Sequence, residues 1–295
     1  MSGTATDAGD GAGDGNDEAG RHRVEETTKE LLGTPIRIGC TSSSLAAAVA
    51  ELFSAFPSVA AGEPAHRFVV VDGCATHGRE RCVHTGSVTA DVSGDAGTAL
   101  SWLLTAVNGA ALDGFAGLAV HAGVVASGTS AIAFPAPSGA GKTTLTAAAL
   151  LAGFDYVSDE ALCVEPSDGR LVPYPRALAL SAWSRQAVGL DGTDGVALGA
   201  GEVAIPADRL GAAVALGPLA LAHVVLLVRR AGAPALVPAD RADAMTWLLQ
   251  RSFNHYKRPT GSFELAAELA RRATAWRLEF GDPTQAASLL RDRLG

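Results

Sequence analysis

The sequence is poor in cysteine, in aromatic side chains and in long apolar runs. Four cysteines among 295 residues exclude the class of small disulfide-rich proteins. Because no basic, apolar leader with a cleavage site stands at the start, we expect reduced thiols and a cytoplasmic protein. The longest apolar run, LALAHVVLLV at residues 219–228, has about half the length of a bilayer-spanning helix. We therefore expect a buried strand there and no membrane partner.

Positive charge is scarce as well. The formal net charge is −8, and only three of the 23 basic residues are lysines, namely Lys29, Lys142 and Lys257. This balance gives no indication of a nucleic-acid surface, which requires a cluster of basic side chains. Residues 1–20 hold five acids and no Lys or Arg, and residues 1–22 have almost no bulky side chains. Residues 1–22 cannot bury enough apolar surface to offset the entropy of ordering, so we expect a disordered tail.

The remainder of the chain predicts an α/β protein, because apolar runs of strand length alternate with segments of helical pattern. We expect a small N-terminal α/β subdomain at residues 23–94 and a larger domain at residues 95–295. In the first, IRIGC and FVVVDG are predicted strands, with a helix at residues 43–53 between them. For the second we predict helices at residues 96–108, 240–252, 262–272 and from 284, and strands at residues 221–229 and 275–280.

The most informative stretch is PAPSGAGKTT at residues 135–144. It follows a predicted β-hairpin at residues 118–135 and precedes an alanine-rich helix that closes at Gly153, which is the context of a phosphate-binding loop. Backbone N–H groups in such a loop, backed by a helix N-terminus, surround nucleotide phosphates, and small residues keep that approach open. The predicted nucleotide-binding residues are Pro137, Ser138, Gly139, Ala140, Gly141, Lys142, Thr143 and Thr144.

Two residues of this loop have specific predicted roles. Lys142 can reach the outer phosphates, and the Thr143 hydroxyl can bind Mg²⁺. The loop departs from the common pattern at Ala136, where glycine is usual, and alanine excludes the positive φ angles that glycine takes easily. The alternative is a turn rich in glycine and serine whose lysine is incidental.

An acidic pair, Asp159 and Glu160, follows Lys142 by 17 and 18 residues. A helix and a return strand between them would bring the acids beside the loop. A carboxylate there can hold Mg²⁺ or accept a proton from an attacking hydroxyl. Adjacent side chains on a strand point to opposite sides, so we expect only one acid to face the phosphate. The alternative is a solvated strand edge.

The ordered motifs LAVHAGVV, PSGAGKTTL, YVSDE and PYPRALAL resemble the C-terminal catalytic domain of HPr kinase/phosphatase, and especially its HPr-kinase-like relatives. In that family a histidine, the phosphate loop and an acidic pair recur at about these separations, and the fold is similar to that of phosphoenolpyruvate carboxykinase. The resemblance covers roughly residues 95–290. It implies a mixed β-sheet P-loop kinase core that uses ATP and Mg²⁺.

The resemblance also implies roles for single residues. His121, which alone would read as a buried core histidine, becomes an active-site residue. Asp159 is implied as the base that takes the acceptor's proton, with Glu160 assisting or binding metal, and the two roles are interchangeable. Arg176 fits an arginine near the acceptor or the transferring phosphate, where its charge would stabilise the transition state, although a surface arginine is the alternative. The predicted metal ligands are Thr143, Asp159 and Glu160.

One family feature is missing. The glycine- and arginine-containing signature of the bifunctional HPr enzymes is replaced by VGLDGTDGVALGAGE at residues 188–202, which puts HPr as substrate and the reverse phosphorolysis in doubt. The expected acceptor is a serine or threonine of a peptide or protein, or a hydroxyl of a small molecule, and a homo-oligomer is left open. The open alternatives are an ATPase that releases phosphate into water and a module that binds nucleotide without chemistry.

Three weaker groupings complete the candidates. Residues 74–84 contain a C-x2-H-x4-C-x-H pattern that fits zinc, with a plain loop and strand as the alternative; its members are Cys74, His77, Cys82 and His84. RSFNHYKRP at residues 251–259 gathers basic and aromatic side chains, which fits an acidic ligand or a solvated helix end. The tryptophans are expected to pack in the core or between the subdomains; they are Trp102, Trp183, Trp247 and Trp276.

Overall fold

The structure, a computed structural model, describes residues 24–60, 62–72, 81–85, 88–92 and 95–295. The predicted tail at residues 1–22 lies outside these ranges, as do Cys74 and His77 of the predicted zinc pattern. The described chain is an α/β protein with mixed sheets, as the alternation of apolar patterns predicts.

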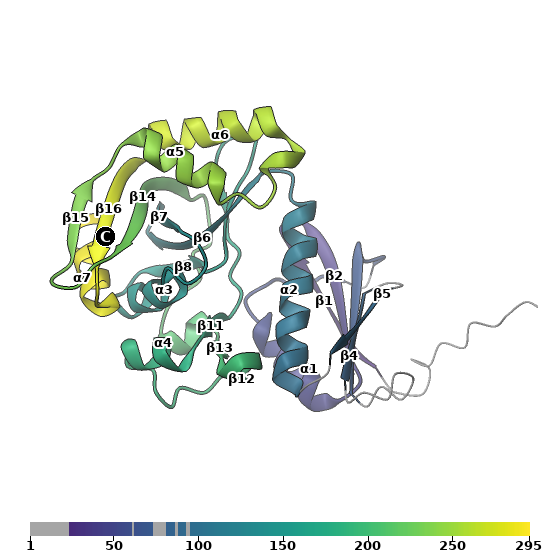
Figure 1. The fold of residues 1–295 in the computed structure, drawn as a ribbon. Helices are drawn as coiled ribbons and strands as arrows, with labels where there is room; N and C mark the ends of the chain where they lie inside the picture. Colours follow the sequence, from purple (N-terminus) through teal and green to yellow (C-terminus); the bar gives the residue numbers. More distant parts are fainter. Residues whose placement is uncertain (1–23, 61, 73–80, 86–87, 93–94) are drawn as a thin grey trace, which may run out of the picture.

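A five-stranded sheet with the order β1-β2-β3-β4-β5 forms the N-terminal part (Figure 1). Strands β2 and β3 are parallel and are connected by α1, whereas the other neighbouring pairs are antiparallel. The helix and the strands predicted in this part are therefore confirmed. Their bounds are β1 (Glu25–Leu31), β2 (Thr34–Cys40), α1 (Ser43–Leu52), β3 (His66–Asp72), β4 (Arg81–Thr85) and β5 (Val88–Val92).

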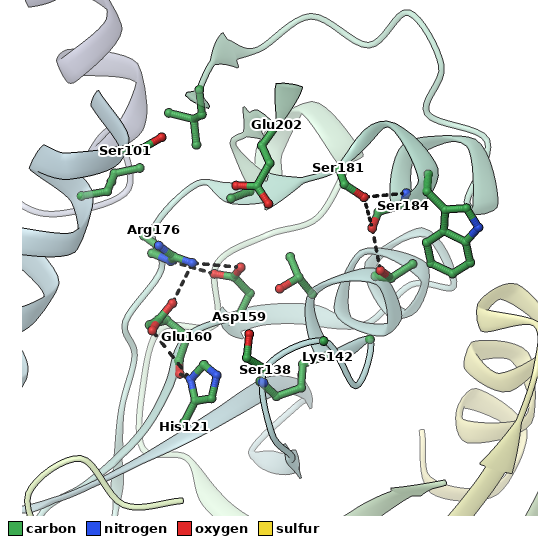
Figure 2. A pocket seen from close by; sticks show the side chains of 18 of the residues that line it. Ser101, His121, Ser138, Lys142, Asp159, Glu160, Arg176, Ser181, Ser184 and Glu202 are labelled. Atoms are coloured by element: carbon green, nitrogen blue, oxygen red, sulfur yellow. Dashed lines mark hydrogen bonds and ion pairs between the residues drawn. The ribbon is translucent and has the colours of Figure 1, made fainter. Parts of the chain in front are cut away.

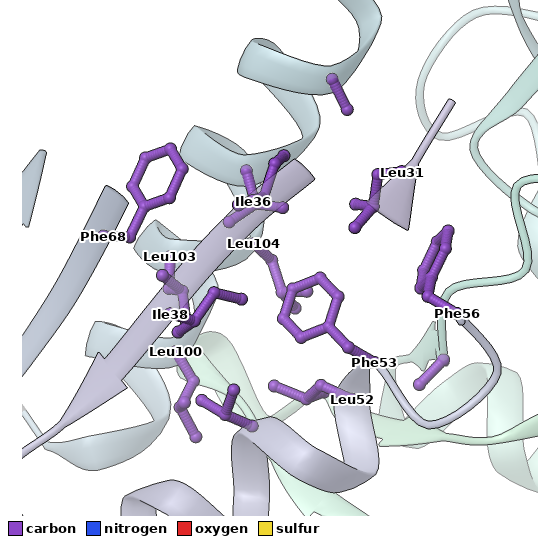
Figure 3. Packing of buried hydrophobic residues seen from close by; sticks show 14 of the residues in the cluster. Leu31, Ile36, Ile38, Leu52, Phe53, Phe56, Phe68, Leu100, Leu103 and Leu104 are labelled. Carbon is purple, nitrogen blue, oxygen red and sulfur yellow. The ribbon is translucent and has the colours of Figure 1, made fainter. Parts of the chain in front are cut away.

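Helix α2 (Ala96–Gly114) packs against this sheet and stands between it and the rest of the molecule (Figure 1). The Asp95 side chain accepts a hydrogen bond from the Thr98 N–H and caps the helix start. Apolar side chains three and four positions apart on α2 enter one buried cluster with β1, β2, β3 and α1. Its members in Figure 3 include Leu100, Leu103 and Leu104 of α2 beside Ile36, Ile38 and Phe53.

An eight-stranded sheet forms the larger part, in the order β10-β9-β6-β7-β14-β16-β15, with β8 paired to β6. The predicted hairpin is the antiparallel pair β6/β7, and β14 runs parallel to both β7 and β16. The apolar run at residues 219–228 is thus a central strand, as predicted. The bounds are β6 (Leu118–Ser127), β7 (Ser130–Pro135), β8 (Asp155–Ser158), β9 (Ala161–Val164), β10 (Leu171–Val172), β14 (Ala220–Arg229), β15 (Ala235–Pro238) and β16 (Thr274–Phe280).

Helices cover both faces of this sheet because its central strands are apolar on both sides. Val124 faces one buried cluster and Val125 the other, and Val224 and Val225 divide in the same way. Helices α3 (Lys142–Leu151) and α7 (Pro283–Leu294) complete one cluster, while α5 (Arg241–Gln250) and α6 (Pro259–Arg272) complete the other (Figure 1). The predicted helices in this part are confirmed, and α2 extends to Gly114, beyond its predicted end.

A third, small sheet with the order β11-β13-β12 lies next to α3 and α4. Its strand β12 comes from the glycine-rich segment at residues 188–202, which also contains the short helix η3. The bounds are β11 (Leu178–Leu180), α4 (Ala182–Ala187), β12 (Val196–Ala197), η3 (Gly199–Gly201), β13 (Val203–Ile205), η4 (Ala207–Leu210) and, beyond β15, η5 (His255–Lys257). None of the helices in the described ranges combines the length and apolar character that crossing a membrane requires.

Candidate functional site

Two glycines shape the loop between β7 and α3. Gly139 and Gly141 have φ angles of 79° and 94°, in the region where a side chain is strained. A loop of this kind at a helix N-terminus turns backbone N–H groups toward an anion. Ala136 is not among the described non-glycine residues with positive φ, which are Leu32 and Ala200. Ala136 is buried among apolar side chains, so alanine fits the position where the motif departs from glycine.

Lys142 is folded back over this loop. Its Nζ donates hydrogen bonds to the carbonyl oxygens of Ala136 and Pro137 at 2.9 and 3.0 Å, and only 5% of the residue is exposed. Burial lowers the pKa of Lys142 to about 8, and the carboxylates of Glu160 and Asp159 oppose this effect. An anion bound in the loop would supply further negative charge and raise this pKa toward its ordinary value.

The acidic pair lies in a bend between β8 and β9. The Ser158 hydroxyl oxygen accepts hydrogen bonds from the backbone N–H groups of Glu160 and Ala161, at 3.1 and 2.9 Å. These bonds turn the chain at the end of β8, so the alternation of an extended strand does not apply. Asp159 and Glu160 both line the same cavity. The continuous strand from which we expected only one acid to face the phosphate is therefore wrong, and which of the two acids faces a phosphate stays a prediction.

Arg176 joins the two acids (Figure 2). Its Nε lies 3.2 Å from Asp159 Oδ1, and its Nη2 lies 2.7 Å from Glu160 Oε2. The Tyr156 hydroxyl lies 3.0 Å from Asp159 Oδ1 and 2.7 Å from the Arg176 carbonyl oxygen. Burial alone would lower the pKa of Arg176, but the two carboxylates outweigh burial and hold it above its ordinary value. Arg176 is thus a fixed, largely buried cation, not a surface arginine.

His121, on β6, contacts Glu160 of this acidic pair. Its Nδ1 lies 3.1 Å from the carbonyl oxygen and 3.7 Å from Oε1 of Glu160 (Figure 2). The ring packs edge-on against Phe253, with centroids 5.4 Å apart. Burial lowers the pKa of His121, the charge of Lys142 adds to this effect, and Glu160 opposes it. The neutral imidazole is favoured, and the tautomer with the proton on Nδ1 donates to the Glu160 carbonyl oxygen.

One wall of the site joins Thr144 of the predicted loop to residues that the motifs did not reveal. Thr144 Oγ1 lies 2.9 Å from Ser184 Oγ, which lies 3.0 Å from Ser181 Oγ, so hydroxyl groups connect α3 to α4 (Figure 2). Trp183 of α4 and Arg229 at the end of β14 line the same wall. Trp183 is 54% exposed and Trp102 of α2 is 53% exposed, so the packed positions predicted for these two tryptophans are wrong. The contacts depend on how α4 folds over α3, which no local pattern indicates.

The opposite wall joins α2 to the glycine-rich segment. Ser101 and Thr105 of α2 lie there with Leu198 and Glu202. The Glu202 carboxylate points into the cavity (Figure 2), and no described residue is recorded as its side-chain partner. The sequence predicts a helix at residues 96–108 and a replaced signature at residues 188–202, but no local pattern indicates that the two segments meet beside the loop. This wall was therefore not predicted.

These walls enclose a cavity of about 480 Å³. Most of the residues predicted from the sequence meet there, and they are His121, Ser138, Gly139, Gly141, Lys142, Thr143, Thr144, Asp159, Glu160 and Arg176. Pro137 and Ala140 do not line it. The Pro137 carbonyl instead holds Lys142, and Ala140 packs against the core.

The donor set suits Mg²⁺. Hydroxyl and carboxylate oxygens, as in Thr143, Asp159 and Glu160, are its preferred ligands, and one or two carboxylates usually act together with substrate phosphates. Asp159 Oδ2 has a long 3.5 Å contact with Arg176 Nη2, and Glu160 Oε1 lies 3.7 Å from His121 Nδ1. Each carboxylate therefore keeps an oxygen with free acceptor capacity. Within the described ranges, no group of three or more His, Cys, Asp and Glu side chains could hold a metal by itself.

The basic segment at residues 251–259 does not line this cavity. Lys257 forms an ion pair with Asp113, and Arg258 donates to the Ala116 carbonyl oxygen. These basic side chains hold the segment against the end of α2, which agrees with the predicted alternative of a solvated helix end.

No protein-family model matches the chain, and no curated protein matches it. The function is therefore inferred from the cavity itself.

Proposed function

We propose that the protein is a Mg²⁺-dependent kinase with a P-loop core of the HPr kinase/phosphoenolpyruvate carboxykinase type, which transfers the γ-phosphoryl group of ATP to a hydroxyl group. The observation that carries this proposal is the meeting, in one cavity, of a glycine-shaped loop, Lys142 and a carboxylate pair joined by Arg176. A phosphate loop alone would serve any nucleotide-binding protein. The acids beside it supply the proton acceptor that transfer to a hydroxyl requires.

At the nucleotide end, the chain would hold phosphates by its backbone and one lysine. The N–H groups of residues 138–143 face the anion, and Lys142 exchanges its bonds to the Ala136 and Pro137 carbonyls for bonds to phosphate oxygens. Thr143 with Asp159 or Glu160 would hold Mg²⁺, which when bound neutralises phosphate charge and aligns the γ-phosphoryl group.

At the acceptor end, the carboxylate pair would remove the proton. The acceptor oxygen attacks the γ-phosphorus, its proton passes to a carboxylate, and the bond to the bridging oxygen breaks to leave ADP. Glu160 has 18% of its side chain exposed and Asp159 has none. Glu160 is therefore the more accessible base, with Asp159 positioning Arg176. Arg176 would balance the charge that develops on the transferring group.

A second candidate is a nucleotide-binding protein without an acceptor. The observation that favours it is the burial of Asp159, whose side chain has no exposed area and already accepts hydrogen bonds from Arg176 and Tyr156. In this case ATP would bind, and any hydrolysis would release phosphate into water.

The test is transfer of labelled γ-phosphate by the full chain to a panel of hydroxyl acceptors, comprising serine- and threonine-containing peptides, sugars and amino alcohols. Lys142→Ala should lower transfer by at least about a hundredfold, and Lys257→Ala, a lysine outside the cavity, should not. Unchanged transfer in Lys142→Ala would remove the loop from the mechanism. Phosphate release into water by the unaltered chain, without a labelled acceptor, would favour the second candidate.

A further inference from the structure

An exposed tryptophan stands at the end of the cavity that the proposed chemistry does not use. Trp183 is 54% exposed although it lines a cavity. Burying a tryptophan is among the largest apolar gains available to a side chain. An indole left open at the rim of a phosphate loop is therefore available to a ligand.

A guanidinium group lies beside this indole. The Arg229 guanidinium carbon is 5.5 Å from the Trp183 ring centroid and 5.0 Å from that of Phe280, both within cation–π range. Its Nη1 donates to the Gly281 carbonyl oxygen at 3.3 Å, and the same atom lies 4.0 Å from the point where a Cβ on Gly141 would stand. No ion pair to a carboxylate of the described residues is recorded for Arg229. Its charge is therefore held at the mouth of the loop, next to the indole.

The position of Glu160 and that of the Trp183 indole at different ends of the cavity define how a nucleotide would be oriented in it. In Figure 2, Glu160 and Ser184 lie on opposite sides of Asp159 and Lys142. Trp183 directly precedes Ser184, whose hydroxyl is bonded to Thr144. A triphosphate whose γ-phosphoryl group faces the acids would run over the loop toward Thr144. The rest of the nucleotide would then leave the loop beside Trp183.

We propose that Trp183 and Arg229 form the platform on which the base of a purine nucleoside triphosphate stacks. The inference rests on the proposed function, since it takes the ligand to be a nucleotide. A base has a flat π-face that stacks on an indole, and Arg229 adds a cation beside the ring and the inner phosphates. Purines fit better than pyrimidines because they offer more stacking area.

The same wall predicts weak discrimination between adenine and guanine. Two hydrogen bonds join the hydroxyl groups of Ser181, Ser184 and Thr144 and use two of their three O–H donors, so at most one donor is left to read the edge of a base. The strength of stacking depends on the area of the base and not on the pattern of hydrogen-bond donors and acceptors along its edge. ATP and GTP should therefore bind with similar affinity, and CTP more weakly.

The experiment measures dissociation constants of ATP, GTP, CTP and inorganic tripolyphosphate, with Mg²⁺, for the full chain and its variants. Trp183→Ala should weaken ATP and GTP binding by about fivefold or more and leave tripolyphosphate binding unchanged. Trp183→Phe should restore most of the loss. Trp102→Ala, which removes a similarly exposed tryptophan outside the cavity, is the matched control and should change nothing. Stacking should also quench the fluorescence of the unaltered chain more than that of Trp183→Phe.

The outcomes separate this inference from the function on which it rests. If Lys142→Ala weakens tripolyphosphate binding but Trp183→Ala leaves ATP binding unchanged, the loop stands and the platform is overturned. Equal weakening of ATP and tripolyphosphate in Trp183→Ala, with no recovery in Trp183→Phe, also overturns the platform, because the loss would then be a structural effect. If the unaltered chain binds neither ligand, the proposed function and the platform are both overturned.

Discussion

The buried state of Lys142 predicts that nucleotide binding takes up a proton above neutral pH. In the unliganded protein the pKa of Lys142 is lowered to about 8 by burial, so the side chain is increasingly neutral above that pH. A bound triphosphate would stabilise the ammonium form and return its pKa toward the ordinary value of about 10.5. Between these two values the complex holds one proton more than the free protein, and affinity must fall as the pH rises.

The size of the effect follows from the two pKa values. With a pKa of about 8 in the free protein and about 10.5 in the complex, the dissociation constant should rise about 30-fold between pH 7 and pH 9.5. Below pH 7 both states are charged at this site, so Lys142 contributes no further dependence there.

The assay is titration calorimetry with Mg²⁺-ATP from pH 7 to pH 9.5, in buffers of different ionisation enthalpy so that proton uptake is counted directly. Circular dichroism at each pH verifies that the protein stays folded. Lys142→Arg is the control variant, because a guanidinium group stays charged throughout this range. Its affinity for ATP should be nearly independent of pH even where it is weaker overall.

Two results would refute this reasoning. A constant affinity of the unaltered chain for ATP from pH 7 to pH 9.5 would mean that binding does not change the electrostatic environment of Lys142. The same slope in Lys142→Arg would assign the proton uptake to another group. Either result would separate the depressed pKa of this lysine from phosphate recognition.

Further predictions concern the acids and the loop. Glu160→Gln should lower turnover by about a hundredfold, and both Glu160→Gln and Asp159→Asn remove one carboxylate partner of the largely buried Arg176. The unfolding free energy should fall in both variants, by about 3 kcal/mol for the fully buried Asp159 and by less for the partly exposed Glu160. Single-turnover kinetics and urea unfolding measure the two effects, and a larger loss of turnover in Asp159→Asn would exchange the two roles. Ala136→Gly should leave ATP affinity unchanged and destabilise the fold by about 1 kcal/mol. The reason is that the position is buried and its φ is not positive, so glycine gains nothing there. Tighter ATP binding in this variant would contradict the structure of the loop.

The sequence predicts the elements of this fold because most of them carry their own local signal. The central strand β14 is a continuous apolar run, and α3 follows a glycine-shaped loop and ends before Gly153, whose φ is 92°. The departure from the common loop pattern at Ala136 is also local, because only the φ angle of this residue decides whether alanine fits there. Such signals depend on neighbours in the chain, so they can be read without knowing what packs against what.

The site is less predictable where it depends on contacts between distant segments. The motifs place Lys142 and the acids near one another, but they do not reveal that Ser158 bends the chain so that both acids face one cavity. The partner of those acids, Arg176, is fixed by an ion pair across 17 residues. The prediction for Trp183 is wrong for the same reason, since only the fold of α4 over α3 leaves its indole exposed.

The two walls of the cavity therefore differ in how far the sequence predicts them. The side proposed to bind the nucleotide is built from contiguous motifs, because phosphates are recognised by backbone groups that one turn can supply. The other side joins α2, which packs on the N-terminal sheet, to the segment at residues 188–202, and it presents Ser101, Thr105 and Glu202. An acceptor bound there would meet hydroxyl groups and a carboxylate without a recorded partner, a set suited to a polar or cationic molecule. Because this wall is assembled from both parts of the chain, the choice of acceptor in the proposed reaction would depend on how the N-terminal sheet is docked, and the phosphate motif alone would not determine it.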